Sequence, residues 1–163
     1  MYTKKTLANF TNPKNYGKLE NPDGIGKVGN IVCGDVMWLY IKVTKNKITD
    51  IKFETFGCVA AIATSSEITE LAKGKTIAKA LSISKEEIVK SLGGLPPVKL
   101  HCSVLAVDAL EEAIYDYLIK NKMPIPVELI KKHERIEQEK KIVECKYKDW
   151  TEAEARATSN KNK

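Results

Sequence analysis

Five side chains in the sequence have the types and the spacing that metal or sulfur chemistry requires. The thiols belong to Cys33, Cys58 and Cys102, while Asp35 lies two residues after the first thiol and His101 directly precedes the third. None of the four cysteines forms a close CxxC pair, which disfavours a zinc finger and a thioredoxin-type redox motif. Three sulfurs with one imidazole or carboxylate suit tetrahedral zinc or the irons of an iron–sulfur cluster.

Other interpretations of the same side chains stay open from residue types alone. Each cysteine can be a small buried hydrophobe, with Asp35 capping a turn and His101 bonded to a backbone carbonyl. The thiols can also close a structural zinc site in an interaction module. A thiol enzyme would use Cys102 as nucleophile and His101 as base, but we expect adjacent side chains at a helix start to point apart, and no third group orients them.

The elements around the thiols are predicted by the period of the hydrophobic pattern. Apolar residues alternate over residues 36–43 and 51–54, which predicts an antiparallel hairpin with its turn at 45–47. Cys33 precedes this hairpin, Cys58 follows it and Cys102 begins the core helix, so all three lie at element ends. In a compact body such ends converge on one edge of the sheet, and a helix N-terminus there favours the thiolate form of a cysteine.

The rest of the first 124 residues predicts helices that cover this hairpin. Helical spacing is found in four segments: residues 4–10, 61–72, 84–93 and 103–120. Ser84 and Glu87 form a capping box at the start of the third helix, and the last helix carries a continuous apolar stripe, which marks it as the core helix. Residues 12–30 are rich in Gly, Asn and Pro and are expected to be loop, with at most an edge strand. The predicted fold is α+β, with a small antiparallel sheet of about three strands packed against helices.

Composition limits the class of protein. Hydrophobic residues make up 43% of the 163 residues and charged residues 29%, with a formal net charge of +6, as in a globular chain that buries a core. No apolar run reaches the ~20 residues of a membrane span, and the N-terminal residues carry no signal-peptide core, so we expect a cytoplasmic protein. Only Arg135 and Arg156 among the 27 basic residues are arginines, which disfavours nucleic-acid binding.

A change in composition near Pro124 divides the chain into two parts. Residues 1–124 form the predicted domain, and residues 125–163 form a charged extension that is helical or partly disordered. We expect Cys145 in this extension to have no part in the site. The residues at near-helical spacing that would rest on the body are Leu129, Ile130, His133, Ile136 and Ile142.

Three motifs occur in a fixed order along the chain and together carry a resemblance. They are Cys33-Gly34-Asp35, Thr55-Phe56-Gly57-Cys58 running into residues 61–66, and residues 95–103 with the sequence LPPVKLHCS. In this order they resemble the iron–sulfur cluster assembly scaffold family, which comprises IscU and the N-terminal domain of NifU. The resemblance covers residues 2–122 and includes the opening Asn12-Pro13-Lys14-Asn15 and the Gly29-Asn30 pair.

The resemblance implies a scaffold without catalytic turnover. A [2Fe–2S] cluster would be built on it from iron and from the sulfur of a cysteine desulfurase, and then passed to acceptor apo-proteins. Cys33, Cys58 and Cys102 would be thiolate ligands, Asp35 or His101 would be the fourth ligand, and zinc would bind in the cluster-free state. Cys102 would also accept the desulfurase persulfide. Implied partners are a desulfurase of the IscS or NifS type, Hsp70 and J-protein chaperones, ferredoxin, a frataxin-like protein and further copies of the chain.

The segment Leu95-Pro96-Pro97-Val98-Lys99 has two interpretations. Its prolines favour an extended stretch that suits presentation as a linear ligand, and the matching segment of the family binds an Hsp70-type chaperone. It also suits a rigid connector into the core helix. The zinc-dependent SufU branch, which accepts persulfide sulfur, lacks this segment and carries an insertion that is absent here, so a SufU-like sulfur carrier is the alternative function.

Overall fold

The predicted hairpin forms the centre of a three-stranded antiparallel sheet. The computed structural model describes residues 1–30 and 34–160, and the side chains of residues 143 and 146–160 are not described. The strands are β1 (Gly24–Asn30), β2 (Asp35–Thr44) and β3 (Lys47–Phe56), in the order β1-β2-β3. The helices are α1 (Lys4–Thr11), α2 (Val59–Ala72), α3 (Ile77–Leu81), α4 (Lys85–Ser91), α5 (His101–Lys120) and α6 (Val127–Asn160), with a 3-10 turn η1 (Pro97–Lys99).

The hairpin forms because its alternating side chains match the two faces of a sheet. Leu39 lies opposite Phe53, and Ile41 lies opposite Ile51, all four of them on the buried face. The turn holds Lys45 and its neighbour Asn46 in the left-handed region. The predicted α+β fold with a small antiparallel sheet is confirmed.

Residues 24–30 form a seven-residue edge strand, whereas the sequence predicted that residues 12–30 would be mainly loop, with at most an edge strand. Glycines weaken a strand, but here they let a helix approach it closely. A Cβ atom added at Gly26 would lie 2.1 Å from the carbonyl oxygen of Ala109, and one at Gly24 would lie 2.2 Å from that of Ala113. The backbone of α5 therefore lies directly against β1, and this tertiary packing leaves no room for a side chain at Gly24 or Gly26.

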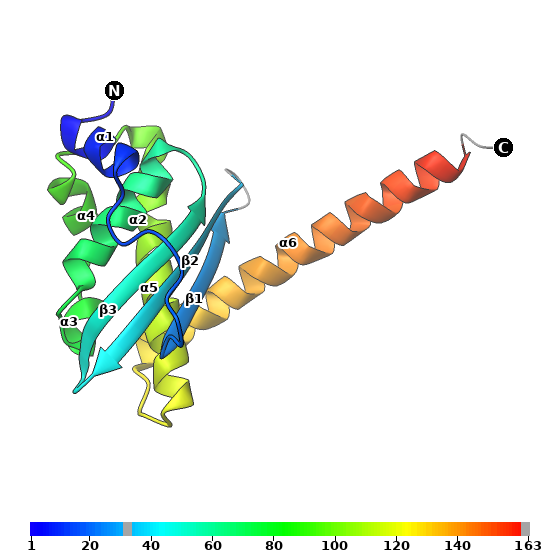
Figure 1. The fold of residues 1–163 in the computed structure, drawn as a ribbon. Coiled ribbons are helices and arrows are strands. Elements are labelled where there is room, and N and C mark those ends of the chain that lie inside the picture. The colour runs from blue at the N-terminus through cyan, green and yellow to red at the C-terminus, as the bar shows by residue number, and fades with distance from the viewer. Residues whose placement is uncertain (31–33, 161–163) are drawn as a thin grey trace.

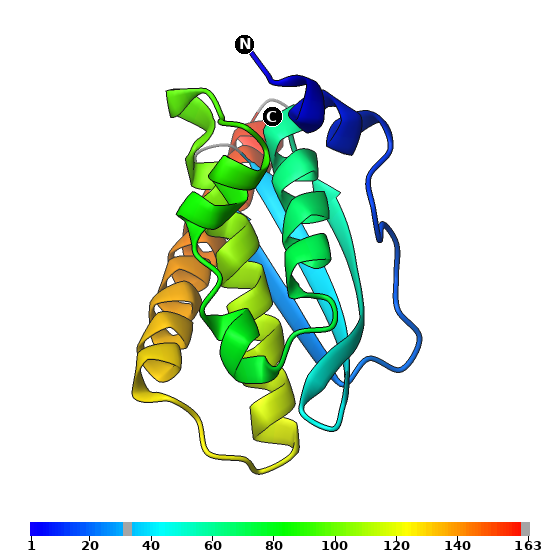
Figure 2. The same ribbon diagram turned by 90° about the vertical axis from the view of Figure 1, so that its left-hand side faces the viewer.

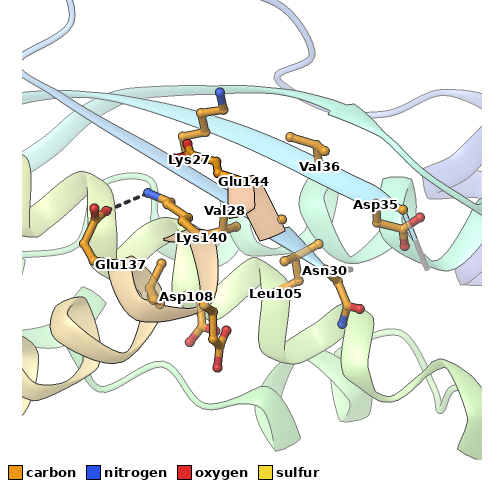
Figure 3. A pocket seen from close by; sticks show the side chains of 14 residues that line it. Lys27, Val28, Asn30, Asp35, Val36, Leu105, Asp108, Glu137, Lys140 and Glu144 are labelled. Carbon is orange, nitrogen blue, oxygen red and sulfur yellow. Dashed lines mark hydrogen bonds and ion pairs between the residues drawn. The ribbon is translucent and has the colours of Figure 1, made fainter. Parts of the chain in front are cut away.

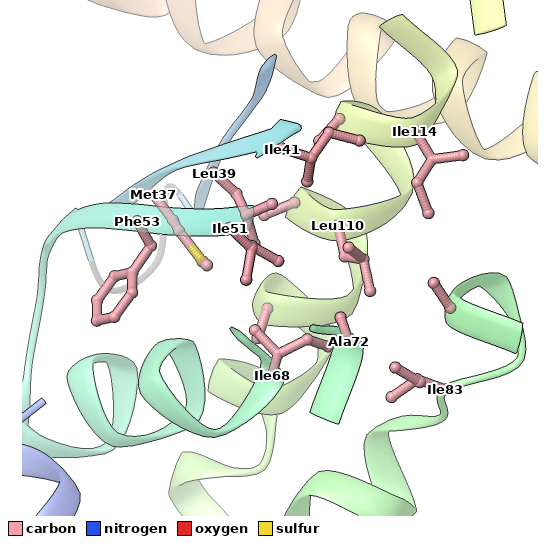
Figure 4. Close-up of a cluster of buried hydrophobic side chains, with 14 of the residues drawn as sticks. Met37, Leu39, Ile41, Ile51, Phe53, Ile68, Ala72, Ile83, Leu110 and Ile114 are labelled. Atoms are coloured by element: carbon pink, nitrogen blue, oxygen red, sulfur yellow. The ribbon is translucent and has the colours of Figure 1, made fainter. Parts of the chain in front are cut away.

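A layer of helices covers one face of the sheet, with α5 lying over β1 and β2 and α2 lying over β3 (Figures 1 and 2). Leu110 and Ile114 of α5 pack against the hairpin, and Ile68 of α2 joins the same core beside α5 (Figure 4). The predicted capping at Ser84 is present, since its Oγ accepts from the backbone N–H of Glu87 at 3.2 Å. Helix α3 was not predicted, because five residues are too few to show a helical period.

Helix α1 is held on the body by a buried carboxylate. Glu67 of α2 is 3% exposed and accepts hydrogen bonds from Lys5 at 3.1 Å and from Asn9 at 3.3 Å. It also accepts from Ser91 of α4. One acidic side chain thus joins three helices, and residues 15–17 continue from α1 along the edge of β3 through bonds to Phe53.

Helix α6 begins against α5 and then extends away from the body (Figure 1). Leu129 and Ile136 are 3% and 4% exposed, as their helical spacing predicted, whereas Ile142 is 52% exposed. Polar contacts to α5 accompany this apolar seam, such as that of Arg135 with Asp108 at 3.1 Å. In the described ranges, no helix combines the length and apolar character needed to cross a membrane.

Candidate metal centre

Three element ends bring a carboxylate and two thiols together at one edge of the sheet. Asp35 is the first residue of β2, Cys58 is the N-cap residue of α2, and Cys102 is the second residue of α5. The two sulfurs are 3.9 Å apart, and Asp35 Oδ2 lies 4.0 Å from Cys58 Sγ and 3.9 Å from Cys102 Sγ. The structure thus brings together two of the three thiols that were predicted to converge, with Asp35 beside both. Cys33 lies outside the described residues.

These separations fit a shared metal ion. With metal–sulfur bonds of ~2.3 Å and tetrahedral angles, two sulfurs on one ion lie about 3.8 Å apart. The observed 3.9 Å matches this value. The corresponding sulfur-to-oxygen separation is about 3.5 Å, so the carboxylate needs to move by only a few tenths of an ångström. The donors therefore fit zinc or an iron of an iron–sulfur cluster.

His101 lies beside Cys102, contrary to the expectation that the two side chains point apart. Its Nε2 is 3.5 Å from Cys102 Sγ. Both candidates for the fourth ligand, Asp35 and His101, thus reach the same sulfur. The expectation that the side chains of His101 and Cys102 point apart was therefore wrong.

The centre is buried on one side and open on the other. Asp35 is 4% exposed and Cys102 is 1% exposed, whereas Cys58 is half-buried. Thr64 of α2 donates a hydrogen bond to the carbonyl oxygen of Cys102 at 3.2 Å, which ties α2 to the start of α5. Of the two described thiols at the centre, Cys58 is therefore the more accessible.

Sequence reasoning missed the part that Gly57 plays. A Cβ atom at Gly57 would meet Ala61 at 2.7 Å and the carboxyl group of Asp35 at 3.1 Å. Its motif position beside Cys58 was the available signal, but the contact with Asp35 depends on the fold.

The segment at residues 95–99 is only partly extended. Pro96 has the φ and ψ of an extended chain (−54° and 140°), but Pro97 to Lys99 form the 3-10 turn η1. The prediction of a continuous extended stretch was wrong beyond Pro96, because the chain bends here to start α5. Lys99 faces the centre: the negative charge of the Cys58 thiolate raises the pKa of the Lys99 amino group. Val98 is 76% exposed.

A cavity of about 690 Å³ adjoins the centre on the side of β1 and α6. Asp35 lies at one end of it and Glu137 of α6 lies at the other (Figure 3). Lys27 of β1 and Leu105 of α5 contribute to its walls. Asp35 therefore lies between the thiols and this cavity.

A three-stranded sheet that presents thiols and a carboxylate at the ends of its elements defines a metal-binding α+β domain. The NifU-like N-terminal domain family matches residues 1–124, and the chain belongs to this family. Over 121 residues the chain is 60% identical to "Iron-sulfur cluster assembly scaffold protein IscU 1" of Archaeoglobus fulgidus, covering 74% of this chain and 79% of the relative.

Two further similarities extend this comparison. The IscU scaffold protein of Aquifex aeolicus is 43% identical over 155 residues, which cover 94% of this chain and 90% of the relative. The crystal structure of a putative iron–sulfur cluster assembly scaffold protein for the SUF system from Fervidobacterium islandicum superposes with a TM-score of 0.59 at 26% identity, covering 69% of this chain and 96% of that one.

Proposed function

We propose that the protein is a scaffold on which a [2Fe–2S] cluster is assembled from iron and desulfurase-derived sulfur and then passed to acceptor apo-proteins. The observation that carries the proposal is the 3.9 Å separation of Cys58 Sγ and Cys102 Sγ with Asp35 Oδ2 beside both. Relatives named as IscU scaffold proteins at 43–60% identity support it. The cluster is cargo, so the protein acts as a carrier and not as an enzyme.

In this proposal the thiolates of Cys33, Cys58 and Cys102 hold the cluster, and Asp35 or His101 completes the ligand set. A hard carboxylate binds iron–sulfide species less firmly than a fourth thiolate does. Asp35 therefore keeps the cluster exchangeable, which a carrier requires. Zinc is the expected occupant in the cluster-free state, because the same donors suit it.

Sulfur delivery assigns a second task to Cys102. Its thiolate attacks the outer sulfur of the desulfurase persulfide, the S–S bond of the donor breaks, and the donor thiolate leaves, so the step is redox-neutral. Cys102 is 1% exposed, and the turn at Pro97–Lys99 precedes it directly. We therefore expect this turn to swing aside when the desulfurase docks.

The exposed turn also suits chaperone recognition. Residues 95–99 place Val98 in solvent at 76% exposure, next to a lysine that faces the centre. An Hsp70-type chaperone with its J-protein would bind here to promote transfer. The remaining expected partners are the cysteine desulfurase, ferredoxin, a frataxin-like protein, acceptor apo-proteins and further copies of the chain. Free thiols in the site require a reducing compartment such as the cytoplasm.

Anaerobic reconstitution tests the proposal. The full chain is incubated with iron, cysteine and a cysteine desulfurase, followed by optical and Mössbauer spectra and by transfer to an apo-ferredoxin. A [2Fe–2S] spectrum that is lost in Cys33→Ser, Cys58→Ser and Cys102→Ser and moves to the acceptor is expected. Cys145→Ser is the matched control, since Cys145 is an exposed thiol on α6.

The same experiment separates the scaffold from a zinc-dependent sulfur carrier of the SufU kind. A protein that keeps one tightly bound zinc, forms no cluster and only accepts persulfide sulfur would overturn the proposal.

A further inference from the structure

A second group of metal-ligating side chains lies at the seam between α5 and α6, outside the thiol centre. Glu112 of α5, together with His133 and Glu137 of α6, offers one ligand atom each, and these three atoms all lie within 4.8 Å of one another. His133 and Glu137 are one helical turn apart, so they present their side chains on the same face of α6. Glu112 meets them from the opposite side of the seam.

The imidazole of His133 is held in an orientation that suits ligation. Its ring stacks on Tyr115, with centroids 3.9 Å apart and an interplanar angle of 14°. This stacking directs Nδ1 at Glu112, whose Oε1 and Oε2 are each 3.0 Å away. Two ligand atoms bound to one zinc ion at ~2.1 Å with tetrahedral angles lie about 3.4 Å apart. The pair would therefore need to open by only a few tenths of an ångström to share an ion.

The charges at this seam favour a bound cation. The side chain of Glu112 is 7% exposed, and a buried carboxylate needs a positive partner. His133 supplies that charge only when it is protonated. A divalent ion would instead neutralise Glu112 and Glu137 together, with a neutral imidazole as the nitrogen ligand.

A competing cation is already present beside Glu137. Lys140 Nζ lies 2.9 Å from Glu137 Oε1, an ion pair drawn as a dashed line in Figure 3. Both side chains are partly exposed, at 32% and 41%, so solvent screens this ion pair. Lys140 therefore competes with a metal ion for Glu137 and lowers the affinity of the site.

We propose that Glu112, His133 and Glu137 form a second metal site that binds one divalent first-row ion, such as Zn²⁺, through nitrogen and oxygen ligands. One imidazole and two carboxylates match the preference of these ions, and water completes the coordination shell on the open side of Glu137. The ion bridges α5 and α6 and so holds the extended helix on the body. This site is independent of the cluster function.

Cobalt(II) titration of the full chain tests the proposal, because its spectrum distinguishes the two sites. Thiolate ligation gives an intense near-ultraviolet charge-transfer band, whereas nitrogen and oxygen ligation gives only weak visible bands. The wild-type chain should bind two equivalents, one of each spectral kind. His133→Ala should lose the equivalent without the charge-transfer band and keep the other, while Cys58→Ser with Cys102→Ser should do the reverse.

Variants on the exposed side of the seam keep the test independent of folding. Glu137→Gln should weaken cobalt binding at least tenfold, while Lys140→Met should strengthen it several-fold. Glu139→Gln, on the same turn of α6, is the matched control and should bind like wild type. Equal affinities of wild type, His133→Ala and Glu137→Gln for the second equivalent, or a single equivalent with the thiolate band in wild type, would overturn the second site. A wild-type chain that binds cobalt only at the second site, with no thiolate charge-transfer band, would count against the proposed function and not against the second site.

Discussion

Gly57 packs directly against the carboxyl group of Asp35. A Cβ atom at Gly57 would lie 3.1 Å from both Cγ and Oδ1 of Asp35. Because Asp35 Oδ2 reaches the sulfurs of Cys58 and Cys102, the absence of a side chain at Gly57 sets how the carboxylate meets the thiols.

Removal of the carboxylate should make the centre hold its cargo longer. In Asp35→Ala, no hard oxygen ligand competes at the cluster, so the reconstituted cluster should persist roughly tenfold longer and transfer more slowly. Cluster lifetime under anaerobic chelator challenge, and the rate of transfer to apo-ferredoxin, measure both effects. Equal lifetimes in wild type and variant would contradict this role of Asp35.

Gly57→Ala should displace the carboxylate without deleting it. The new methyl group also meets Ala61 at 2.7 Å, so we expect a loss of about 1–3 kcal/mol in the free energy of unfolding. Cluster lifetime should change in the same direction as in Asp35→Ala, by a smaller factor. Urea unfolding of the apo-protein and the chelator assay measure the two effects, and a lifetime unchanged from wild type would show that Gly57 does not position Asp35.

Gly26→Ala should destabilise the body by about 2 kcal/mol or more. The added Cβ would lie 2.1 Å from the carbonyl oxygen of Ala109 and 2.7 Å from the backbone nitrogen of Ala113, so β1 and α5 must separate. Gly29→Ala on the same strand is the control, since its nearest contact would be 3.6 Å. Similar urea midpoints for the two variants would show that the close approach of α5 is not needed.

Glu67→Ala should loosen the N-terminal helix. The variant leaves Lys5, Asn9 and Ser91 without their shared acceptor, and the expected loss in the free energy of unfolding is about 2–3 kcal/mol. Limited proteolysis should then cut within residues 4–11 first. Glu70→Ala, an exposed glutamate on the same helix, should behave like wild type.

The Asp108 carboxyl group should make stability depend on pH in mildly acidic solution. Burial raises its pKa to about 6, from about 3.9 in the unfolded chain. The folded protein therefore keeps a proton that the unfolded chain has lost, so this contribution is complete below about pH 4 and disappears as the pH rises through 6. Between these values wild type should lose about 1–2 kcal/mol relative to Asp108→Asn.

Urea unfolding of both proteins from pH 4 to pH 7 measures this difference. Because Arg135 pairs with Asp108, the two proteins differ in absolute stability, and the slope of the difference against pH is the relevant quantity. Parallel profiles would rule out a raised pKa at Asp108.

Local patterns predicted the hairpin and the core helix because their side chains repeat with the period of the element. The strand at residues 24–30 was only partly predicted. Its glycines are required by the close approach of the α5 backbone, whereas strand propensity disfavours glycine. The turn at residues 97–99 was missed for a related reason: prolines favour extension, but the entry into α5 overrides them.

The sequence predicted which residues form the centre but not how their side chains are arranged. Element ends indicated that the cysteines would converge, with Asp35 and His101 beside them. The approach of the His101 imidazole to the Cys102 sulfur depends on a side-chain rotamer, which sequence spacing cannot reveal. Likewise, His133 was expected only to rest on the body. Its carboxylate partner Glu112 lies on another helix, 21 residues away.

The centre is assembled from segments that are distant in the chain: Asp35 and Cys58 are separated by 23 residues, and Cys58 and Cys102 by 44. No short stretch carries enough donors to keep a metal by itself, so retention is a property of the whole folded domain. A bound ion should therefore stabilise the domain against denaturation, because it binds only the folded state. Conversely, opening any one of the three segments would remove a donor from the centre, so a bound ion would be released without a dedicated release reaction.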